Sequence, residues 1–191
     1  DNATLTINYQ IGDHTLTAIS AWLSYKYSEL CDCDFTGSPL FNVKSDENYD
    51  QYSQEIRLIS PADQTLEYIA GAYYQTSSLD FKDRFAVPSG SPVPTIIAGN
   101  FAGNVPLQTA ALSLFTNLAA PRTFIQDTDL WSVFAQATWN IRDDLRLIAG
   151  GRYTSEEKKG SRVLNFVDYV TGTPASSAVD QSVLANTLKA E

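Results

Sequence analysis

Apolar and polar residues alternate with a period of two along much of the chain, while helical periodicity is scarce. Because successive side chains of a β-strand point to opposite faces, this alternation predicts strands with one apolar and one polar face. We predict an all-β fold whose strands are joined as antiparallel hairpins. The six expected strands span residues 3 to 10, 15 to 29, 49 to 60, 66 to 80, 128 to 141 and 145 to 158.

The two faces of each predicted strand are assigned by parity. The fifth strand is the clearest, because Trp131, Val133 and Trp139 share one face with small apolar residues. By the same criterion the apolar face of the second strand comprises Ile19, Ala21, Leu23 and Tyr25. The polar faces of the later strands carry charged and amide side chains, which include Glu55, Arg57, Gln136, Arg146 and Arg152.

The connections between the predicted strands alternate between short and long. Residues 10 to 14, 60 to 65 and 140 to 145 are turns rich in Gly, Pro, Asp and Asn, whereas residues 30 to 48 and about 81 to 127 are much longer. Long connections are uncommon inside compact soluble domains, but outer-membrane barrels combine short periplasmic turns with long extracellular loops. The longest connection also predicts a short amphipathic helix, because apolar residues recur at helical spacing at Leu107, Ala111, Leu114 and Leu118.

The apolar faces could border either a protein core or a lipid bilayer. Trp131 and Trp139 lie eight residues apart on one face, which is about 26 Å of strand at a rise of about 3.3 Å per residue. Two aromatic girdles separated by small apolar residues are typical of membrane barrels. The predicted strands also exceed the usual length of about 5–6 residues. We therefore predict that the apolar faces meet lipid, with interfacial aromatic residues at Tyr68, Tyr74, Trp131, Trp139 and Tyr153.

The orientation of the predicted strands across the membrane follows from the same assignment of faces. The turn that contains Asp143 would be periplasmic, so Trp139 is expected at the periplasmic interface and Trp131 nearer the outer one. The polar faces would line the lumen, where we expect Glu55, Arg57, Gln136, Arg146 and Arg152.

Composition narrows the possible functions only in part. The formal net charge of −9, without a cluster of Lys and Arg, argues against nucleic-acid binding. No run approaches the roughly 18 apolar residues of a membrane-spanning helix. The 43% hydrophobic content would also fill a soluble core, so the alternative is a soluble secreted β-sandwich or small barrel that binds carbohydrate. A third hypothesis is an outer-membrane enzyme with catalytic residues on its loops.

The sequence offers few candidates for chemistry. His14 is the only histidine and lies in a predicted turn, so we interpret it as a solvated turn residue rather than a catalytic one. Cys31 and Cys33 form neither a zinc framework nor a disulfide scaffold; they could be free, paired with each other, or paired with another chain. The stretch from Asp32 begins like a calcium loop, but its twelfth position is Val43 where a glutamate is needed. We therefore predict no catalytic residue, no cofactor and no metal.

Aromatic residues of the long connection could contact a ligand at an outer mouth, or pack the connection against itself, which we favour. They are Phe81, Phe85, Phe101, Phe115 and Phe124.

Two segments resemble a known family. "YDQYSQEIRLISPADQTLEYIAGAYYQ" (residues 49 to 75) and "DLWSVFAQATWNIRDDLRLIAGGRYTSEEKK" (residues 129 to 159) are similar to consecutive barrel hairpins of TonB-dependent outer-membrane receptors, and residues 16 to 27 fit the preceding strand more loosely. The resemblance implies an outer-membrane barrel of about 22 strands in a Gram-negative bacterium, closed by a plug and energised through TonB. It also implies uptake of a ligand such as an iron-siderophore complex, haem, cobalamin or an oligosaccharide.

The resemblance fits only part of such a receptor. The sequence contains neither a plug nor a TonB-interaction segment, and six strands cannot close so large a barrel. We therefore expect residues 1 to 191 to be a partial barrel domain from inside a longer protein. Its partners would be outer-membrane lipid, the small-molecule ligand and, through segments that are absent here, TonB. An open sheet with unpaired edge strands is the predicted structure.

Overall fold

The computed structural model describes residues 1–88 and 90–174. Within these residues it contains seven strands and two helices. In chain order they are β1 (Asn2–Ile11), β2 (His14–Cys31), β3 (Asn42–Ile59), β4 (Leu66–Ala86), α1 (Val93–Gly99), α2 (Val105–Thr116), β5 (Leu118–Arg142), β6 (Leu145–Leu164) and β7 (Val167–Asp168).

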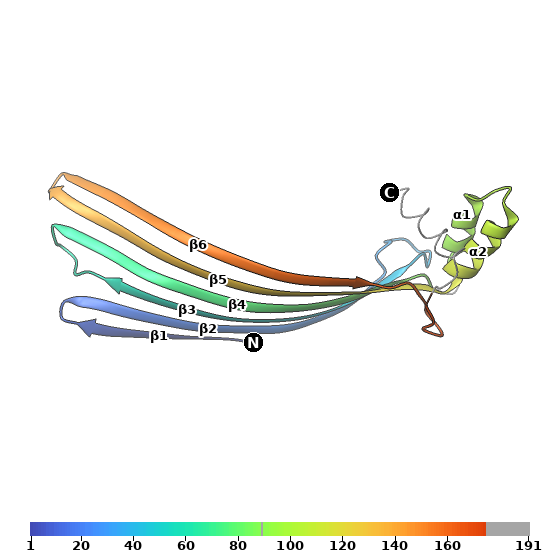
Figure 1. Cartoon of the computed structure of the whole chain (residues 1–191), viewed down its shortest axis with the longest axis horizontal. Coiled ribbons are helices and arrows are strands. Elements are labelled where there is room, and N and C mark those ends of the chain that lie inside the picture. Colours follow the sequence, from blue (N-terminus) through green and yellow to red (C-terminus); the bar gives the residue numbers. More distant parts are fainter. Residues whose placement is uncertain (89, 175–191) are drawn as a thin grey trace. The chain divides into compact units, whose positions relative to one another are not determined.

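The strands of the described residues form one sheet, in which β1 to β6 lie in the order of the sequence. Figure 1 shows their arrows running in alternating directions. β1 pairs with β2 in an antiparallel register that runs from Asn2 opposite Leu23 to Ile11 opposite His14. The short β7 pairs with the beginning of β5. Because β1 and β6 are edge strands, the sheet is open, and the predicted antiparallel all-β fold class is confirmed.

The predicted strand ends agree with the structure at the short turns and are wrong at the long connections. At the short turns each of the six ends lies within one residue of its prediction. At the long connections β3 begins at Asn42 rather than residue 49, and β5 begins at Leu118 rather than residue 128. The missed parts do not alternate. Lys82, Asp83 and Arg84 are consecutive charged residues at the end of β4, and β5 begins with consecutive apolar residues from Leu118 to Pro121. Without a period of two, these parts gave no strand signal.

The short turns are stabilised by residues that tolerate a left-handed backbone. Gly12 has a φ of 60° in the two-residue connection between β1 and β2. Asp63 has the same φ of 60° between β3 and β4, and its backbone N–H donates to the side chain of Glu67 over 2.9 Å. Glycine and aspartate are among the residues that adopt this conformation at least cost, which explains their place in tight turns.

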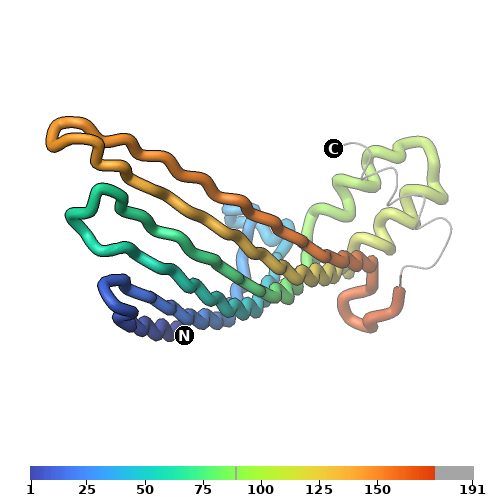
Figure 2. The backbone as a smooth tube through the Cα atoms, turned by 60° about the vertical axis from the view of Figure 1, so that its left-hand side comes forward, coloured from blue at the N-terminus to red at the C-terminus, as the bar shows by residue number. Residues whose placement is uncertain are grey.

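The chain divides into two compact units, which we describe separately. Unit 1 comprises Asp1–Lys26, Asn48–Asp80 and Ile125–Ser161, and holds the short turns with the adjoining strand segments. Figure 2 shows its hairpins lying side by side along the backbone trace. Unit 2 comprises Tyr27–Glu47, Phe81–Phe124 and the described residues from Arg162, and includes both helices.

Unit 2 contains a conventional hydrophobic core. The helices α1 and α2 pack against each other and against the strand ends that flank them. The buried residues of this core are Val87, Ala98, Ala111, Phe115 and Leu118. The core explains why a long connection in this chain is ordered, because burial of apolar surface offsets the entropy of fixing the backbone.

The predicted amphipathic helix corresponds to α2, with one correction at its end. Its first turn is capped by Asn104, whose side chain accepts a hydrogen bond from the backbone N–H of Leu107 over 3.3 Å. Ala111 is fully buried, as the pattern predicts, but Leu118 begins β5 instead of continuing the helix. The helix α1 was not predicted, because its seven residues follow a Pro-rich segment and are too few to display a period. Among the described residues, no helix is long and apolar enough to traverse a bilayer.

Candidate functional site

Unit 1 has the reverse of the polarity expected for a soluble protein. Large apolar side chains of its strands are exposed, whereas its fully buried side chains are polar. In β5 the alternation is sharp: Ser132 is 1% exposed, and its neighbours Trp131 and Val133 are each 47% exposed. The buried residues of this unit are Thr17, Ser53, Thr128 and Ser132.

Three of the predicted interfacial aromatic residues lie near one another on the exposed apolar face. The rings of Trp131 and Tyr153 have centroids 5.5 Å apart. Tyr74 and Trp131 both line an apolar hollow of about 250 Å³ to which Val133 also contributes. The hydroxyl of Tyr74 donates to Asp129 over 3.0 Å. An aromatic ring with an apolar body and a bonded polar tip suits a boundary between apolar and aqueous surroundings.

The other two predicted interfacial residues are closer to the short turns. Trp139 is half exposed in β5. The hydroxyl of Tyr68 lies 2.9 Å from Nε2 of His14, and their rings are 5.8 Å apart. His14, interpreted from the sequence as a solvated turn residue, therefore contacts a tyrosine of another hairpin. The placement of these five aromatic residues at membrane interfaces stays a prediction.

The opposite face of unit 1 brings together several residues predicted to face the lumen. Arg57 Nη1 lies 3.4 Å from Glu55 Oε1. Arg152 Nη2 donates to Ser132 Oγ over 2.7 Å, and its guanidinium lies 5.9 Å from the centroid of the Phe134 ring. These contacts form a polar surface on which arginines are held by neighbouring side chains.

The remaining two predicted lumen residues are less constrained. Gln136 is exposed in β5. A side-chain carbon added to Gly150 would lie 3.2 Å from the Cβ atom of Gln136, so Gln136 in β5 and Gly150 in β6 are neighbours. Arg146 is exposed in β6, and its side chain makes no hydrogen bond or ion pair with any residue that the structure describes. The assignment of this face to a barrel lumen also stays a prediction.

The second strand departs from the face assigned to it from the sequence. In the register of β1 and β2, Leu5 is opposite Ser20 and Ala3 is opposite Trp22, so the even positions of β2 share the apolar face of β1. Asn8 is opposite Thr17, and the Thr17 hydroxyl donates to its side chain over 2.8 Å. The odd positions of β2 therefore lie on the polar face, and the predicted apolar set was wrong for Ile19, Ala21 and Leu23.

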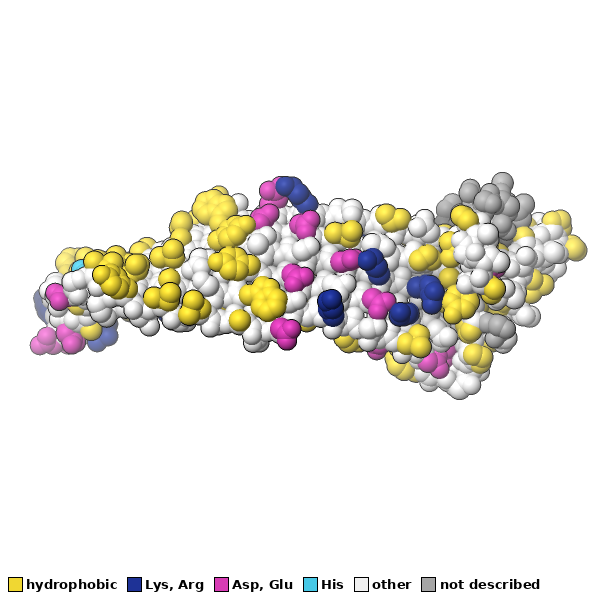
Figure 3. Space-filling model, turned by 90° about the horizontal axis from the view of Figure 1, so that it is seen from below, with side chains coloured by type: hydrophobic (Ala, Val, Ile, Leu, Met, Phe, Trp, Pro, Cys, Tyr) yellow, Lys and Arg dark blue, Asp and Glu magenta, His cyan; other side chains and the backbone are white. Residues whose placement is uncertain are grey.

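Apolar and charged side chains are also segregated on the molecular surface. In Figure 3, hydrophobic side chains gather over part of one face, and acidic and basic side chains gather over another part of the same face. An exposed apolar surface of this kind marks a place where something other than water covers the protein.

Unit 2 contains the cavity that best suits a small-molecule ligand. It has a volume of about 580 Å³, within the range of ligand sites in proteins. Its wall is mainly apolar and aromatic, with contributions from Phe85, Phe115 and Phe166. Of the loop phenylalanines considered from the sequence, Phe115 is buried in the core, and Phe85 and Phe101 pack against it. Phe85 and Phe115 therefore both pack the connection and line the cavity.

Charged residues give this cavity a polar side that the sequence did not reveal. Arg122 and Asp83 form a two-pronged ion pair in its wall, in which Nε of Arg122 donates to Oδ1 of Asp83 over 2.7 Å and Nη2 contacts Oδ2. The Asp83 side chain is only 8% exposed, so the carboxylate is largely removed from water, whereas the Arg122 side chain is 40% exposed. Arg162 also lines the cavity, and its side chain has no hydrogen-bond or ion-pair partner within residues 1–88 and 90–174. Arginine recognises carboxylate and phosphate groups well.

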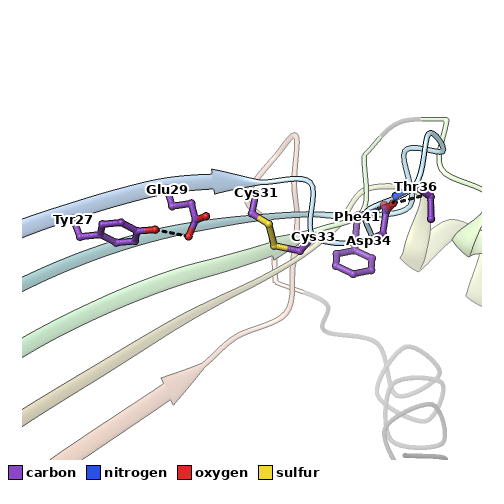
Figure 4. The surroundings of a disulfide bond; sticks show 7 residues. All are labelled: Tyr27, Glu29, Cys31, Cys33, Asp34, Thr36 and Phe41. Carbon is purple, nitrogen blue, oxygen red and sulfur yellow. Dashed lines mark hydrogen bonds between the residues drawn. A yellow bond between two sulfur atoms is a disulfide. The ribbon is translucent and has the colours of Figure 1, made fainter.

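The connection between β2 and β3 is closed by a local disulfide. Cys31 and Cys33, whose state the sequence left open, are bonded to each other (Figure 4). Asp34 lies just beyond the disulfide and accepts hydrogen bonds from the hydroxyl and backbone N–H of Thr36, at 2.7 and 2.8 Å. Phe41 packs near Phe85, with ring centroids 4.9 Å apart. The bond with the Thr36 hydroxyl is the main reason that the pKa of Asp34 lies below its ordinary value.

The predicted calcium-like stretch is organised by its own hydrogen bonds. Asp34 also accepts from the backbone N–H groups of Leu40 and Phe41, at 3.1 and 3.4 Å, so its oxygens cap the turn. Among the described residues, no three His, Cys, Asp or Glu side chains are grouped closely enough to hold a metal ion.

Comparison with known proteins gives a family match over most of the chain. Residues 1–183 match the family model described as "TonB dependent receptor-like, beta-barrel". No curated protein matches the sequence.

Among solved structures, the chain is similar to the ferric yersiniabactin uptake receptor FyuA from Yersinia pestis. The TM-score is 0.61 at 19% sequence identity, over 91% of this chain and 22% of the receptor. The chain thus spans about a fifth of the length of that receptor, and the likeness concerns the fold. The KdgM porin aligns over 85% of this chain and 89% of its own. OccK10 (OpdN) from Pseudomonas aeruginosa aligns over 85% of this chain and 60% of its own. At 7% and 8% identity and TM-scores of 0.15, they carry no argument.

Proposed function

Because the chain belongs to the TonB-dependent receptor-like β-barrel family, we propose that it forms part of the barrel wall of a receptor for ligand uptake in the outer membrane of a Gram-negative bacterium. The observation that carries this proposal is the reversed polarity of unit 1. Its exposed apolar face would meet lipid, and its face of held arginines and buried hydroxyl groups would line the passage. A transmembrane barrel alternates apolar residues outward and polar residues inward in this way.

The long connections supply the side of the wall at which a ligand would be captured. The cavity of unit 2 combines an aromatic wall with Arg162, whose side chain is not paired within the described residues, which suits a ligand with an apolar body and an anionic group. An iron-siderophore complex, haem and cobalamin are the ligand types that the family suggests, with oligosaccharides as a further type. FyuA, whose fold is similar to that of this chain, is named as an uptake receptor for ferric yersiniabactin.

Energised transport would require parts beyond this wall. In our proposal, a plug domain and the inner-membrane partner TonB act through other segments of the complete protein, and no residue of this chain is assigned to energy coupling. We assign no catalytic role to any residue.

The soluble alternative, a secreted β-sandwich that binds carbohydrate, requires a second sheet to cover the apolar face. Among the described residues all strands belong to one sheet, and the buried apolar residues lie in unit 2. The membrane proposal needs no such cover, because lipid supplies it.

A pair of lysine substitutions tests the proposal directly. We expect Val133→Lys to destabilise the chain in lipid vesicles by about 2–4 kcal/mol, because a charge on the lipid face must be removed from water. The control is Gln136→Lys on the opposite face of the same strand, for which we expect little change. Stability is measured by urea unfolding of the vesicle-bound chain, followed by tryptophan fluorescence.

Two outcomes would contradict the proposal. In a water-soluble protein, Val133 and Gln136 are both ordinary surface positions, and both substitutions would change stability by less than about 0.5 kcal/mol. A chain that is monomeric and monodisperse in plain buffer, without detergent, would likewise rule out the membrane wall.

A further inference from the structure

A second hollow in unit 2, which shares Asp83 and Arg122 with the aromatic cavity, has a basic lining. It has a volume of about 260 Å³, several times the roughly 30 Å³ that a water molecule occupies in the liquid. Its basic residues come from three strands: Lys44 from β3, Lys82 and Arg84 from β4, and Arg122 from β5. We call it the basic groove.

The sign of the charge in this groove is opposite to that of the chain. Four basic and two acidic residues, the latter Asp46 and Asp83, line the groove and give it a formal charge of +2. The whole chain has 13 basic and 22 acidic residues and a net charge of −9. A local excess of positive charge against so acidic a background attracts anions to this place in particular.

The two acidic residues of the groove are already bound within the protein. Asp83 is held by Arg122 through its two oxygens. Asp46 accepts a hydrogen bond from the Ser28 hydroxyl over 2.6 Å and lies 3.3 Å from Lys44 Nζ. These contacts orient the groove walls and leave neither carboxylate directed only at solvent.

Arg84 is positioned to contribute donors to an incoming anion. Its guanidinium lies 4.9 Å from the centroid of the Tyr169 ring, a cation–π contact that leaves its N–H donors available for hydrogen bonds. Within the described part of the chain, the Arg84 side chain makes no hydrogen bond to another residue. Thr123 adds a hydroxyl to the lining.

The arrangement of the chain favours a lipid as the source of the anion. Lys82 and Arg84 continue β4 beyond Tyr74 and have the same parity, on the side of the long connections rather than of the short turns. In a membrane wall, basic residues that follow the apolar part of a strand meet the headgroups of anionic lipids. Lysine and arginine together are the usual ligands of phosphate.

We propose that the basic groove binds the phosphate group of an anionic lipid of the surrounding membrane. This inference rests on the proposed function, since it requires the strands to cross a bilayer. The groove would fix this part of the wall at the level of the headgroups, and phosphate-bearing lipids would be enriched around it.

The test compares two lipids that differ only in the phosphate. The full chain in micelles of a neutral detergent is titrated with phosphatidic acid or with diacylglycerol of the same acyl chains, and bound lipid is counted by native mass spectrometry. We expect phosphatidic acid to bind and diacylglycerol to bind at least about tenfold more weakly. The double variant Lys82→Gln with Arg84→Gln should bind phosphatidic acid about 25-fold more weakly, at about fivefold for each charge.

The matched control removes one lysine and one arginine from elsewhere. Arg142→Gln with Lys158→Gln has the same change in charge and composition, and we expect lipid binding to be unchanged. If the groove variant does not fold, as judged by circular dichroism, the wild-type chain still provides the test. Its affinity for phosphatidic acid should fall severalfold when salt is raised from about 0.05 to 0.5 M, because exposed charges are then screened.

Several outcomes would overturn the inference. Equal binding of the two lipids, an unchanged groove variant, an equal loss in the control, or affinity that does not depend on salt would each exclude a phosphate site in the groove. If inorganic phosphate displaces the lipid at equal concentration, the site is one for free phosphate. These results leave the proposed function intact, whereas a chain that needs no detergent would contradict the proposed function itself.

Discussion

Gly71 lies in β4 where the polar face of unit 1 leaves no space for a side chain. A carbon added at this position would lie 2.6 Å from Cζ of Phe134 and 2.7 Å from the carbonyl oxygen of Ile56. The absence of a side chain lets the ring of Phe134 cross over β4, close to Arg57. One small residue thus makes room for the ring of Phe134 on the face that also carries Arg57.

Substitution of this glycine should be costly. We expect Gly71→Ala to lower the free energy of unfolding by about 1–3 kcal/mol, because Phe134 or the backbone of β3 must move. The control is Gly151→Ala in β6, where an added carbon meets nothing within 4 Å and stability should change little. Urea unfolding of the two variants in vesicles measures both. Equal stability of the two variants would contradict the close approach.

Asp34 makes a second prediction at the scale of one residue. Hydrogen bonds from Thr36, Leu40 and Phe41 lower its pKa, so the folded loop holds the charged form more strongly than the unfolded chain does. The resulting stability is complete above the ordinary pKa of 3.8 and is lost as the pH falls through the lowered value. As the pH is lowered, we expect the amide resonances of Thr36 and Leu40 to shift together, with the midpoint of the shift below pH 3.8.

The measurement is an NMR titration between about pH 6 and pH 2. In Asp34→Asn, which cannot titrate, the same amide resonances should stay in place. A midpoint at or above the ordinary value would show that the turn does not stabilise the carboxylate.

The helix α2 depends on its cap as well as on the core. Neither its first turn carries an acidic residue nor its last turn a basic one, so charge does little to stabilise its ends. The Asn104 side chain satisfies the backbone N–H of Leu107, which would otherwise lack a partner at the start of the helix.

Removing the cap should therefore loosen unit 2. We expect Asn104→Ala to cost about 1 kcal/mol, measured as faster amide hydrogen exchange across α2. Asn100→Ala, at the end of α1, is the control, because no side-chain hydrogen bond of Asn100 is found among the described residues. If exchange in α2 rises equally in the two variants, the cap does not contribute.

At the scale of elements, the sequence predicted those features that depend on a residue period or on the residues of a turn. The three hairpins, their short turns and α2 follow from alternation, from Gly, Pro and Asp, and from helical spacing. The face of β2 did not follow, because Ile19 and Leu23 are apolar residues on the polar face and only the pairing with β1 reveals it. The ion pair of Asp83 and Arg122 joins residues 39 positions apart, which no local pattern records.

At the scale of the whole molecule, the three tryptophans test which face meets lipid. Trp22, Trp131 and Trp139 are 45 to 50% exposed. In variants that retain one tryptophan, with the others changed to Phe, we expect lipids brominated on their acyl chains to quench the fluorescence of each. Quenching of Trp131 and Trp139 should be stronger with bromine near the headgroup than at the chain end, because both belong to the predicted girdles.

Exposure of all these tryptophans to water would contradict the predicted contact with lipid. Quenching by aqueous iodide that is unaffected by vesicles, for Trp131 and Trp139 alike, is the result expected of a soluble sheet. Strong quenching of one tryptophan only would instead correct the predicted orientation of the strands.

The order of β1 to β6, in which each strand pairs with its neighbours in the sequence, also bears on how such a wall can change in size. A hairpin added beyond β1 or β6 would meet an edge strand and leave every existing pair unchanged. The circumference of a barrel built on this rule is therefore proportional to the number of hairpins in the chain. Duplication or loss of a single hairpin would alter the width of the pore in one step, while the packing of the remaining strands is inherited intact.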